Sequence, residues 1–373
     1  MKIGILSLKY TCNYGGILQS FALQEILKKF GYDVEIINYK SSHRDSKLHN
    51  LFFRLTNLFF SGNIISLLHD KKREKNKEVG SDSDELIKNN EVFMSSYLNR
   101  GKLVDEDSII EYCHKFDCII VGSDQIWSVT NSSFLVYFID WKFKGKKIAF
   151  SACSVKKVPA LLNRKKIRKA LNSFDAVSVR DTTTAEFVRN TNGLYPIITT
   201  DPTLMYDFRP YIGERLIKER YILLYILGDE INGGNLNALD IIKRKLGINN
   251  LKVVSVILPS VSLVGKKGAD LILDKCDPLM WLNLIFYAEF IFTDSFHGCM
   301  FSINFNKPFI GYYSYEKRAT RLLDIKSRYN LKNIIRDITQ LDKALDSSMQ
   351  KDSLAIQQHV DFSLKFLIEQ IEK

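Results

Sequence analysis

The first forty residues alternate between strand and helix patterns, and this alternation limits the fold more than any other feature of the chain. The segments KIGILSL and DVEIINY are short, apolar and rich in β-forming residues. Between them, GGILQSFALQEILKKFG places its apolar side chains at helical spacing and is followed by a turn at Gly31, which suits a helix C-terminal cap. A strand, a helix and a second strand in this order predict a parallel crossover unit.

The same alternation continues in two series separated by a break near residues 201–220. The first series holds the strand patterns FDCIIVGSD, KKIAFSACS and FDAVSVRD, and the second begins at ERYILLYILGDE and runs to KPFIGYYS. A chain of 373 residues suits two domains rather than one. We therefore expect an α/β fold of two Rossmann-like, doubly wound domains that face each other across a cleft.

The break and the terminal patterns give domain boundaries. We expect an N-terminal domain over residues 1–208, with an irregular helical insertion near residues 40–115. The C-terminal domain is expected over residues 209–345. Residues 346–373 have an amphipathic helical pattern and are expected to pack back across both domains.

The formal net charge of +11 is compatible with several classes of binding partner. Basic runs at Lys71–Lys77 and Asn163–Lys169 fit nucleic acid, an anionic membrane face or anionic small substrates, and a merely solvated basic surface is equally compatible. The sequence contains neither zinc-finger spacing nor an RNA-binding aromatic motif, so no nucleic-acid partner is expected. Leu51–Leu68 is apolar, carries one charge and precedes the first basic run. It can rest on a membrane surface or form a buried helix.

The N-terminus and the cysteines indicate a cytoplasmic protein, peripheral at the inner face of the membrane if Leu51–Leu68 lies on it. MKIGILSLKY is too short for a signal-peptide core, and no apolar run reaches the length of a membrane-spanning helix. Six cysteines are scattered beside apolar runs without a C-x-x-C pair. They are expected to be buried free thiols in a reducing compartment.

Polar and glycine-rich loops follow two of the expected strands in the first domain. In open α/β sheets, ligands bind beyond the carboxyl ends of the strands. Adjacent Gly15 and Gly16 allow close approach of a ligand, and Asn13 and Gln19 can hydrogen-bond a sugar, although a turn without a ligand has the same pattern. In the second loop, the stretch from Gly122 to Trp127, the polar triplet can bind a ligand, and the tryptophan is either a sugar-stacking platform or core.

Arginines follow other strands that lead to the same cleft. Arg180 ends an apolar strand and suits a bidentate contact with a carboxylate or phosphate, the alternative being an ion pair with Asp181 or another carboxylate. Arg318 and Arg321 follow a strand of the second domain and add cations, unless they form a solvated basic turn.

The stretch IFTDSFHG places a histidine at the start of a helix. FIFTD is a strand pattern, and Ser295 can cap a helix that starts at Phe296 or His297. A helix N-terminus offers unpaired N–H groups to an anion, and His297 beside it can donate a proton, although a packed structural histidine is the competing interpretation. No metal-ligand cluster accompanies these residues. The residues alone predict a transferase-like protein that uses an anionic substrate without a metal.

Six ordered motifs resemble the polysaccharide pyruvyl transferase family and extend from residue 3 to about residue 335. They are Asn13-Tyr14-Gly15-Gly16 with Leu18-Gln19 and Ala22-Leu23-Gln24, Val121 to Trp127, Asp201-Pro202-Thr203-Leu204, Thr293 to Gly298, Lys307-Pro308-Phe309, and Arg318 with Leu322-Leu323.

The resemblance implies a fold similar to the B-type glycosyltransferases, with the acceptor side in the N-terminal domain (residues 1–208) and the donor side in the C-terminal domain (residues 209–345). It also implies phosphoenolpyruvate as donor, no further cofactor, and a sugar diol as acceptor. The product would be a cyclic pyruvate ketal on a capsular, exopolysaccharide or cell-wall glycan or on its lipid-linked precursor. By resemblance, His297 is the catalytic residue. Donor-binding roles fall on Arg180, Ser295, Gly298, Arg318 and Arg321, and acceptor-binding roles on Asn13, Tyr14, Gly15, Gly16, Gln19, Ser123, Asp124 and Trp127.

Ser295 departs from the pattern, because some members carry an arginine two residues before the histidine. Arg318 or Arg321 is then expected to bind the donor phosphate. The alternative enzyme is a nucleotide-sugar-dependent glycosyltransferase of the same fold, in which the Gly228-Asp229 loop and Arg318 would face a base and a diphosphate. A non-catalytic scaffold at a membrane surface is the alternative outside enzymes.

Overall fold

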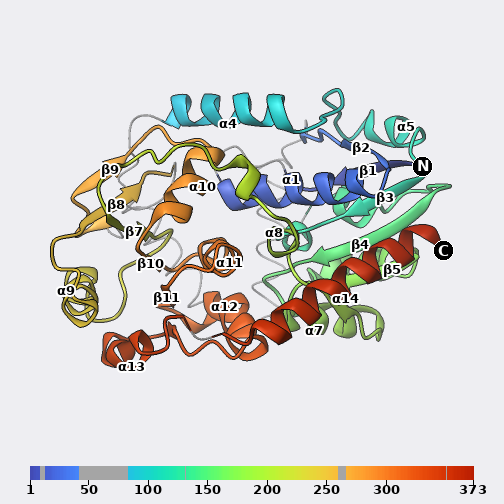
Figure 1. Cartoon of the computed structure of the whole chain (residues 1–373). Coiled ribbons are helices and arrows are strands. Elements are labelled where there is room, and N and C mark those ends of the chain that lie inside the picture. Colours follow the sequence, from blue (N-terminus) through green and yellow to red (C-terminus); the bar gives the residue numbers. More distant parts are fainter. Residues whose placement is uncertain (9–12, 42–82, 131, 259–265, 350) are drawn as a thin grey trace.

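Two parallel sheets form the framework of the chain, and a computed structural model describes residues 1–8, 13–41, 83–130, 132–258, 266–349 and 351–373 (Figure 1). The first sheet has the strand order β2-β1-β3-β4-β5-β6, and the second has the order β12-β11-β10-β7-β8-β9. The strands of the first sheet are β1 Lys2–Leu6, β2 Asp33–Ile36, β3 Cys118–Val121, β4 Lys146–Ala152, β5 Ala176–Val179 and β6 Ile197–Ile198. Those of the second are β7 Tyr221–Tyr225, β8 Lys252–Val256, β9 Leu271–Leu273, β10 Phe290–Thr293, β11 Phe309–Tyr312 and β12 Ile334–Ile335.

Helices connect the strands, as the alternating sequence pattern predicts. They are α1 Tyr14–Lys29, α4 Ser83–Tyr97, α5 Ile109–Cys113, α6 Arg164–Leu171, α7 Thr182–Asn192, α8 Pro202–Met205, α9 Asn235–Leu246, α10 Pro278–Tyr287, α11 Phe296–Asn304, α12 Glu316–Arg328, α13 Leu341–Leu345 and α14 Ser353–Glu372. The two doubly wound α/β domains expected from the sequence are therefore confirmed.

Side-chain caps determine where the helices nearest the sheet edges begin. Asn13 accepts a hydrogen bond from the Gly16 amide at the start of α1, and Ser295 accepts one from the Gly298 amide at the start of α11. Each cap satisfies one of the donors that a first helical turn leaves unpaired. The helix start predicted at Ser295 is thus confirmed.

Each sheet reverses its strand order beside its first strand. In the first sheet, β1 pairs with β2 on one side and with β3 on the other, and in the second sheet β7 pairs with β8 and with β10. Such a reversal opens a crevice at the carboxyl ends of the two strands involved. The loops after β1, β3, β7 and β10 are therefore the places to look for a ligand site.

The two domains share a hydrophobic core through α1, α8, α10 and α11, which lie between the sheets in Figure 1. Tyr14 stacks on Trp281 with ring centroids 5.6 Å apart, and the centroids of Phe208 and Phe301 are 4.9 Å apart. All four side chains are buried. Such aromatic contacts add to the free energy of burial, so they fix how the two sheet edges face each other.

Helix α14 returns from the second domain to the first (Figure 1). The Ser363 hydroxyl accepts a hydrogen bond from the Thr200 amide, and the Lys146 ammonium donates to the carbonyl of Ile371 near the C-terminus. His359 lies 2.8 Å from the Tyr329 hydroxyl and 3.1 Å from the Ile198 carbonyl oxygen, so it contacts both domains. This helix therefore braces the two domains from outside the cleft.

Residues 42–82 of the insertion near residues 40–115 lie outside the described residues, and from residue 83 onward it holds α4 and α5. Leu51–Leu68 and Lys71–Lys77 lie outside the described residues. In the part that is described, no helix combines the length and the apolar character that crossing a membrane requires. The five cysteines that the structure describes are buried free thiols, as expected: Cys113, Cys118, Cys153, Cys276 and Cys299.

Candidate active site

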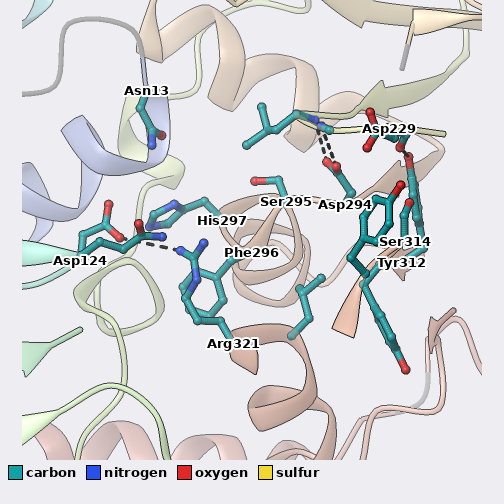
Figure 2. A pocket seen from close by; sticks show the side chains of 16 residues that line it. Asn13, Asp124, Asp229, Asp294, Ser295, Phe296, His297, Tyr312, Ser314 and Arg321 are labelled. Carbon is teal, nitrogen blue, oxygen red and sulfur yellow. Dashed lines mark hydrogen bonds and ion pairs between the residues drawn. The ribbon is translucent and has the colours of Figure 1, made fainter. Parts of the chain in front are cut away.

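A pocket of about 250 Å³ lies where the strand-order reversals of the two sheets face each other. Its walls come from the loops after β1, β3, β7, β10 and β11, together with α12 (Figure 2). The lining residues are Asn13, Asp124, Gln125, Leu227, Gly228, Asp229, Asp294, Ser295, Phe296, His297, Tyr312, Tyr313, Ser314, Tyr315, Arg321 and Leu322.

His297 lies in the first turn of α11 and packs against the first turn of α1 in the other domain. A Cβ atom placed on Gly15 would come within 2.1 Å of Cγ of the His297 ring, so only glycine leaves room for the imidazole. Nε2 of His297 lies 3.8 Å from Oδ2 of Asp201, and no described residue forms a hydrogen bond with it. A buried polar atom without a partner is costly, and at a pocket wall it identifies a place where a ligand can bind.

Asp201 lies beneath His297 and is held in place by several donors. Its carboxylate accepts hydrogen bonds from the Arg180 guanidinium at 2.5 Å, from the Ser123 hydroxyl at 3.2 Å and from the Thr203 amide at 3.0 Å. Burial opposes ionisation, but His297 and the charge of Arg180 outweigh it and hold the pKa of Asp201 well below its usual range. Asp201 is therefore a fixed negative charge beside the imidazole.

Arg321 extends from α12 toward the same end of the pocket and is partly exposed. With the Gln125 amide oriented so that its oxygen faces the guanidinium, it accepts hydrogen bonds of 2.8 and 3.1 Å from Arg321. The guanidinium also lies 3.8 Å from Asp124 and 5.5 Å from the centre of the Phe296 ring. Figure 2 shows Arg321, Asp124 and His297 gathered around one end of the cavity.

The charges at this end of the pocket are nearly balanced. Arg180 is buried between Asp124 and Asp201, at 2.8 and 2.5 Å, and Arg321 adds a second positive charge. Two arginines thus offset two carboxylates, and protonated His297 would leave the group with one net positive charge. An anion that binds here is therefore favoured when His297 carries a proton.

The opposite end of the pocket is formed by the second domain alone. Asp294 follows β10 and accepts hydrogen bonds from the backbone amides of Leu227 and Gly228 at 2.6 and 2.7 Å. Burial raises the pKa of Asp294 to about 6, although these two bonds act in the opposite direction. Figure 2 places Asp229 and Ser314 at this end, so it is polar and contains carboxylates.

The raised pKa of Asp294 predicts a pH-dependent stability. Its pKa in the folded protein is above the unfolded value of about 3.9, so the stabilising contribution is complete below pH ~4 and is lost as the pH rises through about 6. We expect the difference in unfolding free energy between wild type and Asp294→Asn to change by about 2 kcal/mol between pH 4 and pH 8. Urea unfolding at several pH values measures it. The exposed Asp274→Asn is the control, and parallel pH profiles for wild type and Asp294→Asn would contradict the prediction.

Five of the residues predicted from the sequence line this pocket together. They are Asn13, Asp124, Ser295, His297 and Arg321. Arg318 lies in α12, but its side chain is outside the described residues. Gly15 and Gly16 lie in the first turn of α1, where Gly15 makes room for His297 and the Gly16 amide is bonded to Asn13.

Three residues of the first domain that were expected to bind the acceptor have buried side chains that are engaged by the protein itself. Trp127 has no exposed surface, stacks on Phe138 and donates its indole N–H to the Tyr137 carbonyl, so it is core and no sugar platform. The Gln19 side chain is buried, donates to nearby oxygens and accepts from the Ser123 amide, which leaves it no access to a ligand. The Ser123 hydroxyl, also buried, donates to Asp201 and to a backbone carbonyl.

Three further residues with expected binding roles also have their polar groups engaged by the protein itself. The Tyr14 hydroxyl donates to the Cys276 carbonyl inside the shared core, so it does not reach an acceptor. Arg180 is buried and forms ion pairs with two carboxylates, as the alternative interpretation of this residue predicts. Gly298 contacts Thr293, where a Cβ atom would come within 2.5 Å of the threonine hydroxyl, and its amide is used by the helix cap.

Several pocket residues had no individual role predicted from the sequence. Asp294 and Tyr315 each stand just after a strand, so the strand-end rule was the available signal. Gln125 was included only as part of the loop after β3, and Asp229 only as part of the loop in the nucleotide-sugar alternative. Asp201 belongs to a recognised motif, but its place beneath His297 depends on contact between the domains. In the described residues, no three histidine, cysteine or acidic side chains come together as metal ligands.

Comparison with known proteins identifies both a family and a fold. The family model described as "Polysaccharide pyruvyl transferase" matches residues 13–316, and no curated protein matches the chain. The structure is similar to S. aureus MnaA with UDP, with 13% identity and a TM-score of 0.52, covering 100% of this chain and 98% of that one.

Two other solved structures have the same arrangement. One is a Methanocaldococcus jannaschii UDP-GlcNAc 2-epimerase with UDP-GlcNAc and UDP, at 14% identity and a TM-score of 0.51, covering 99% of this chain and 100% of that one. The other is Arabidopsis thaliana UGT89C1 with UDP-L-rhamnose, at 9% identity and a TM-score of 0.50, covering 99% of both chains. At such low identities the likeness concerns the fold alone, and it confirms the expected similarity to B-type glycosyltransferases.

Proposed function

The chain belongs to the polysaccharide pyruvyl transferase family, and from that premise we propose that it transfers the enolpyruvyl group of phosphoenolpyruvate to a sugar diol. The acceptor belongs to a capsular, exopolysaccharide or cell-wall glycan or to its lipid-linked precursor. The product is a cyclic pyruvate ketal, with phosphate released. The observation that carries the proposal is the position of His297. Its Nε2 makes no hydrogen bond of normal length, lies 3.8 Å from the ionised Asp201 carboxylate, and adjoins a pocket that also contains Arg321.

The donor is placed at the end of the pocket that contains His297 and Arg321. Phosphoenolpyruvate carries a carboxylate and a phosphate, and a planar guanidinium suits either group. Arg321 is already oriented by Gln125 and by the Phe296 ring, so it is positioned before the donor binds. It takes the role of the arginine that some relatives hold at the position of Ser295. The first-turn amides of α11 add a partial positive charge at the same end.

The reaction requires one group that accepts a proton and one that donates a proton. Phosphoenolpyruvate and the sugar diol together supply all the atoms of the ketal and of the released phosphate. His297 protonates the methylene carbon while the first sugar hydroxyl adds to the central carbon of the donor. The second hydroxyl then displaces phosphate from that carbon and closes the ring. One hydroxyl proton is retained in the new methyl group by way of the histidine, and the other leaves with the phosphate. A positioned acid of this kind accelerates a reaction by roughly 10²–10⁴-fold.

Asp201 acts in this scheme as a positioning residue. Its ionised carboxylate lies 3.8 Å from Nε2 of His297 and stabilises the imidazolium that donates the proton. Arg180, fully buried beneath it, keeps the carboxylate ionised and fixed. The buried Arg180, which does not reach the donor, thus supports catalysis through Asp201.

The acceptor is placed toward Asp229, Ser314 and Tyr315. Polar oxygens and an exposed tyrosine ring suit the hydroxyls and the apolar face of a sugar. This position moves most acceptor contacts to the second domain, with Asn13 as a contribution from the first. It also brings the two acceptor hydroxyls toward His297 from the side opposite Arg321.

Removal of Arg321 should weaken the donor site without removing the acid. We expect Arg321→Gln to raise the KM for phosphoenolpyruvate at least about 10-fold, because a charge-assisted bond to a carboxylate or phosphate contributes roughly 1.5–3 kcal/mol. Initial rates of phosphate release over a range of donor concentrations measure this. Arg220→Gln removes the same charge from an exposed ion pair with Glu289 and should leave KM unchanged. Equal KM values for the Arg321 variant and wild type would place the donor elsewhere.

Two experiments test the function itself. Phosphoenolpyruvate at 100 times its Kd should stabilise the fold by about 2.7 kcal/mol in a thermal-shift assay, whereas UDP-sugars should not. Stabilisation by a UDP-sugar alone would favour the nucleotide-sugar-dependent glycosyltransferase. Candidate glycans incubated with enzyme and donor should gain the mass of one pyruvate ketal. Failure of both the thermal shift and the mass increase would reject the proposal.

A further inference from the structure

The segment of residues 155–169, between β4 and the end of α6, exposes aliphatic side chains that the catalytic site does not use. Val155, Val158, Leu161 and Leu162 are 49%, 50%, 46% and 48% exposed. Single exposed aliphatic residues are common on protein surfaces, but four within eight residues of chain are not. We call residues 155–169 the basic–aliphatic segment.

The same segment carries seven positive charges and no negative one. They are Lys156, Lys157, Arg164, Lys165, Lys166, Arg168 and Lys169, and all seven are exposed. Among the residues that the structure describes, the ion pairs of this segment are Lys157 with Glu186 and Lys166 with Asp140. Arg164 also donates a hydrogen bond to the Asn190 carbonyl, and burial lowers the pKa of Lys156. Lys165, Arg168 and Lys169 are therefore the cations most available to an anionic surface.

Hydrogen bonds and core packing fix the position of the basic–aliphatic segment on the first domain. The Val155 amide donates to the Ser128 hydroxyl, and the buried Asn163 amide group donates to the carbonyls of Thr130 and Ser132. Ile167 turns inward from α6 and is buried in the core of the first domain. The polar groups beneath this segment are therefore hydrogen-bonded, while its aliphatic side chains remain exposed to solvent.

The basic–aliphatic segment begins near the loop that forms one wall of the pocket. It follows the carboxyl end of β4, which pairs with β3, and the loop after β3 supplies Asp124 and Gln125 to the pocket. The same loop continues to Ser128 and Thr130, which hold the basic–aliphatic segment. The surface and the pocket therefore occupy the same edge of the first sheet.

We propose that the basic–aliphatic segment docks the protein on a bilayer that contains anionic phospholipids. The four aliphatic side chains enter the interface between headgroups and acyl chains, and Lys165, Arg168 and Lys169 face the lipid phosphates. A nucleic acid would use the cations but would gain nothing from exposed valine and leucine beside them. The combination of both kinds of side chain within fifteen residues is what favours the bilayer. The proposal does not depend on which reaction the pocket catalyses.

Co-sedimentation of the full chain with vesicles tests the proposal. Wild type should bind vesicles of phosphatidylcholine and phosphatidylglycerol, should bind phosphatidylcholine vesicles at least about 10-fold more weakly, and should be released by salt. The variant K165E/R168E/K169E should weaken binding by at least about 10²-fold, since each basic side chain near such a surface strengthens binding roughly five-fold. The variant V155S/L161S/L162S should weaken binding to the same vesicles while keeping the salt dependence.

Matched controls separate this surface from the rest of the basic chain. The variant K243E/R244E/K245E makes the same change of charge in the last turn of α9 and should bind vesicles like wild type. Melting temperatures verify that each variant is folded. Vesicle binding that the segment variants leave undiminished would overturn the proposal and assign binding to another part of the chain. Binding to an oligonucleotide without binding to anionic vesicles would also overturn it.

Discussion

Replacement of His297 by glutamine should lower the rate of pyruvyl transfer by about 10²–10⁴-fold, because the proposed acid is removed while the polar side chain still fills the site. The ring is buried between Gly15 and Asp201, and glutamine is flexible enough to occupy the same space. We expect the melting temperature to remain near that of wild type. Phosphate release in the presence of acceptor, followed over time, measures the rate.

The exposed His114 provides the matched control for this substitution. His114 lies just after α5 in the first domain, and His114→Gln should leave the rate unchanged. Donor affinity of the His297 variant should fall much less than its rate at saturating donor, because Arg321 still binds the anion. Near-wild-type phosphate release by His297→Gln would exclude the histidine as the acid.

Gly15→Ala should cost about 10²-fold in rate although residue 15 touches neither substrate in our scheme. The added Cβ atom would come within 2.1, 2.3 and 2.4 Å of three atoms of His297, so the imidazole must move. A misplacement of about 1 Å can cost 10²-fold when geometry is critical. The unfolding free energy should fall by about 1–3 kcal/mol, since α1 is packed in the shared core and cannot yield freely.

A second glycine distinguishes steric displacement from a general effect of added methyl groups. A Cβ atom on Gly213 meets no atom within 4 Å, so Gly213→Ala should keep both rate and stability. Rate measurements and urea unfolding of both variants give the comparison. If Gly15→Ala transfers pyruvyl groups at the wild-type rate, the ring position is not critical and the proposed acid geometry fails.

Much of the fold was predictable because local patterns and global topology agree. The alternating strands and helices, the cap at Ser295 and the rule that ligands bind at strand ends together locate the edge that carries Asn13, Asp124 and His297. The helix and strand patterns and the cap depend on the spacing of residues a few positions apart. The sheet topology follows from the order of these patterns along the chain.

The errors concern residues whose role depends on distant partners. Arg180 pairs with Asp124 and Asp201, which are 56 and 21 residues away in the chain, so its burial could not be inferred from neighbours. Trp127 has the same local pattern whether it faces a cleft or the core, and only its stacking on Phe138 and Phe187 decides between them. The contact of Gly15 with His297 depends on how two domains meet, which no local pattern records.

In the proposed mechanism, the contact between Gly15 and His297 would also control when phosphoenolpyruvate can react with water. Gly15 and His297 belong to different domains. Separation of the domains would therefore move the imidazole away from Gly15 of α1 and, at the same time, away from Asp201. An open enzyme that waits for a bulky glycan would then hold phosphoenolpyruvate without a means to protonate it. Futile hydrolysis of the donor would be confined to the interval in which both domains have closed.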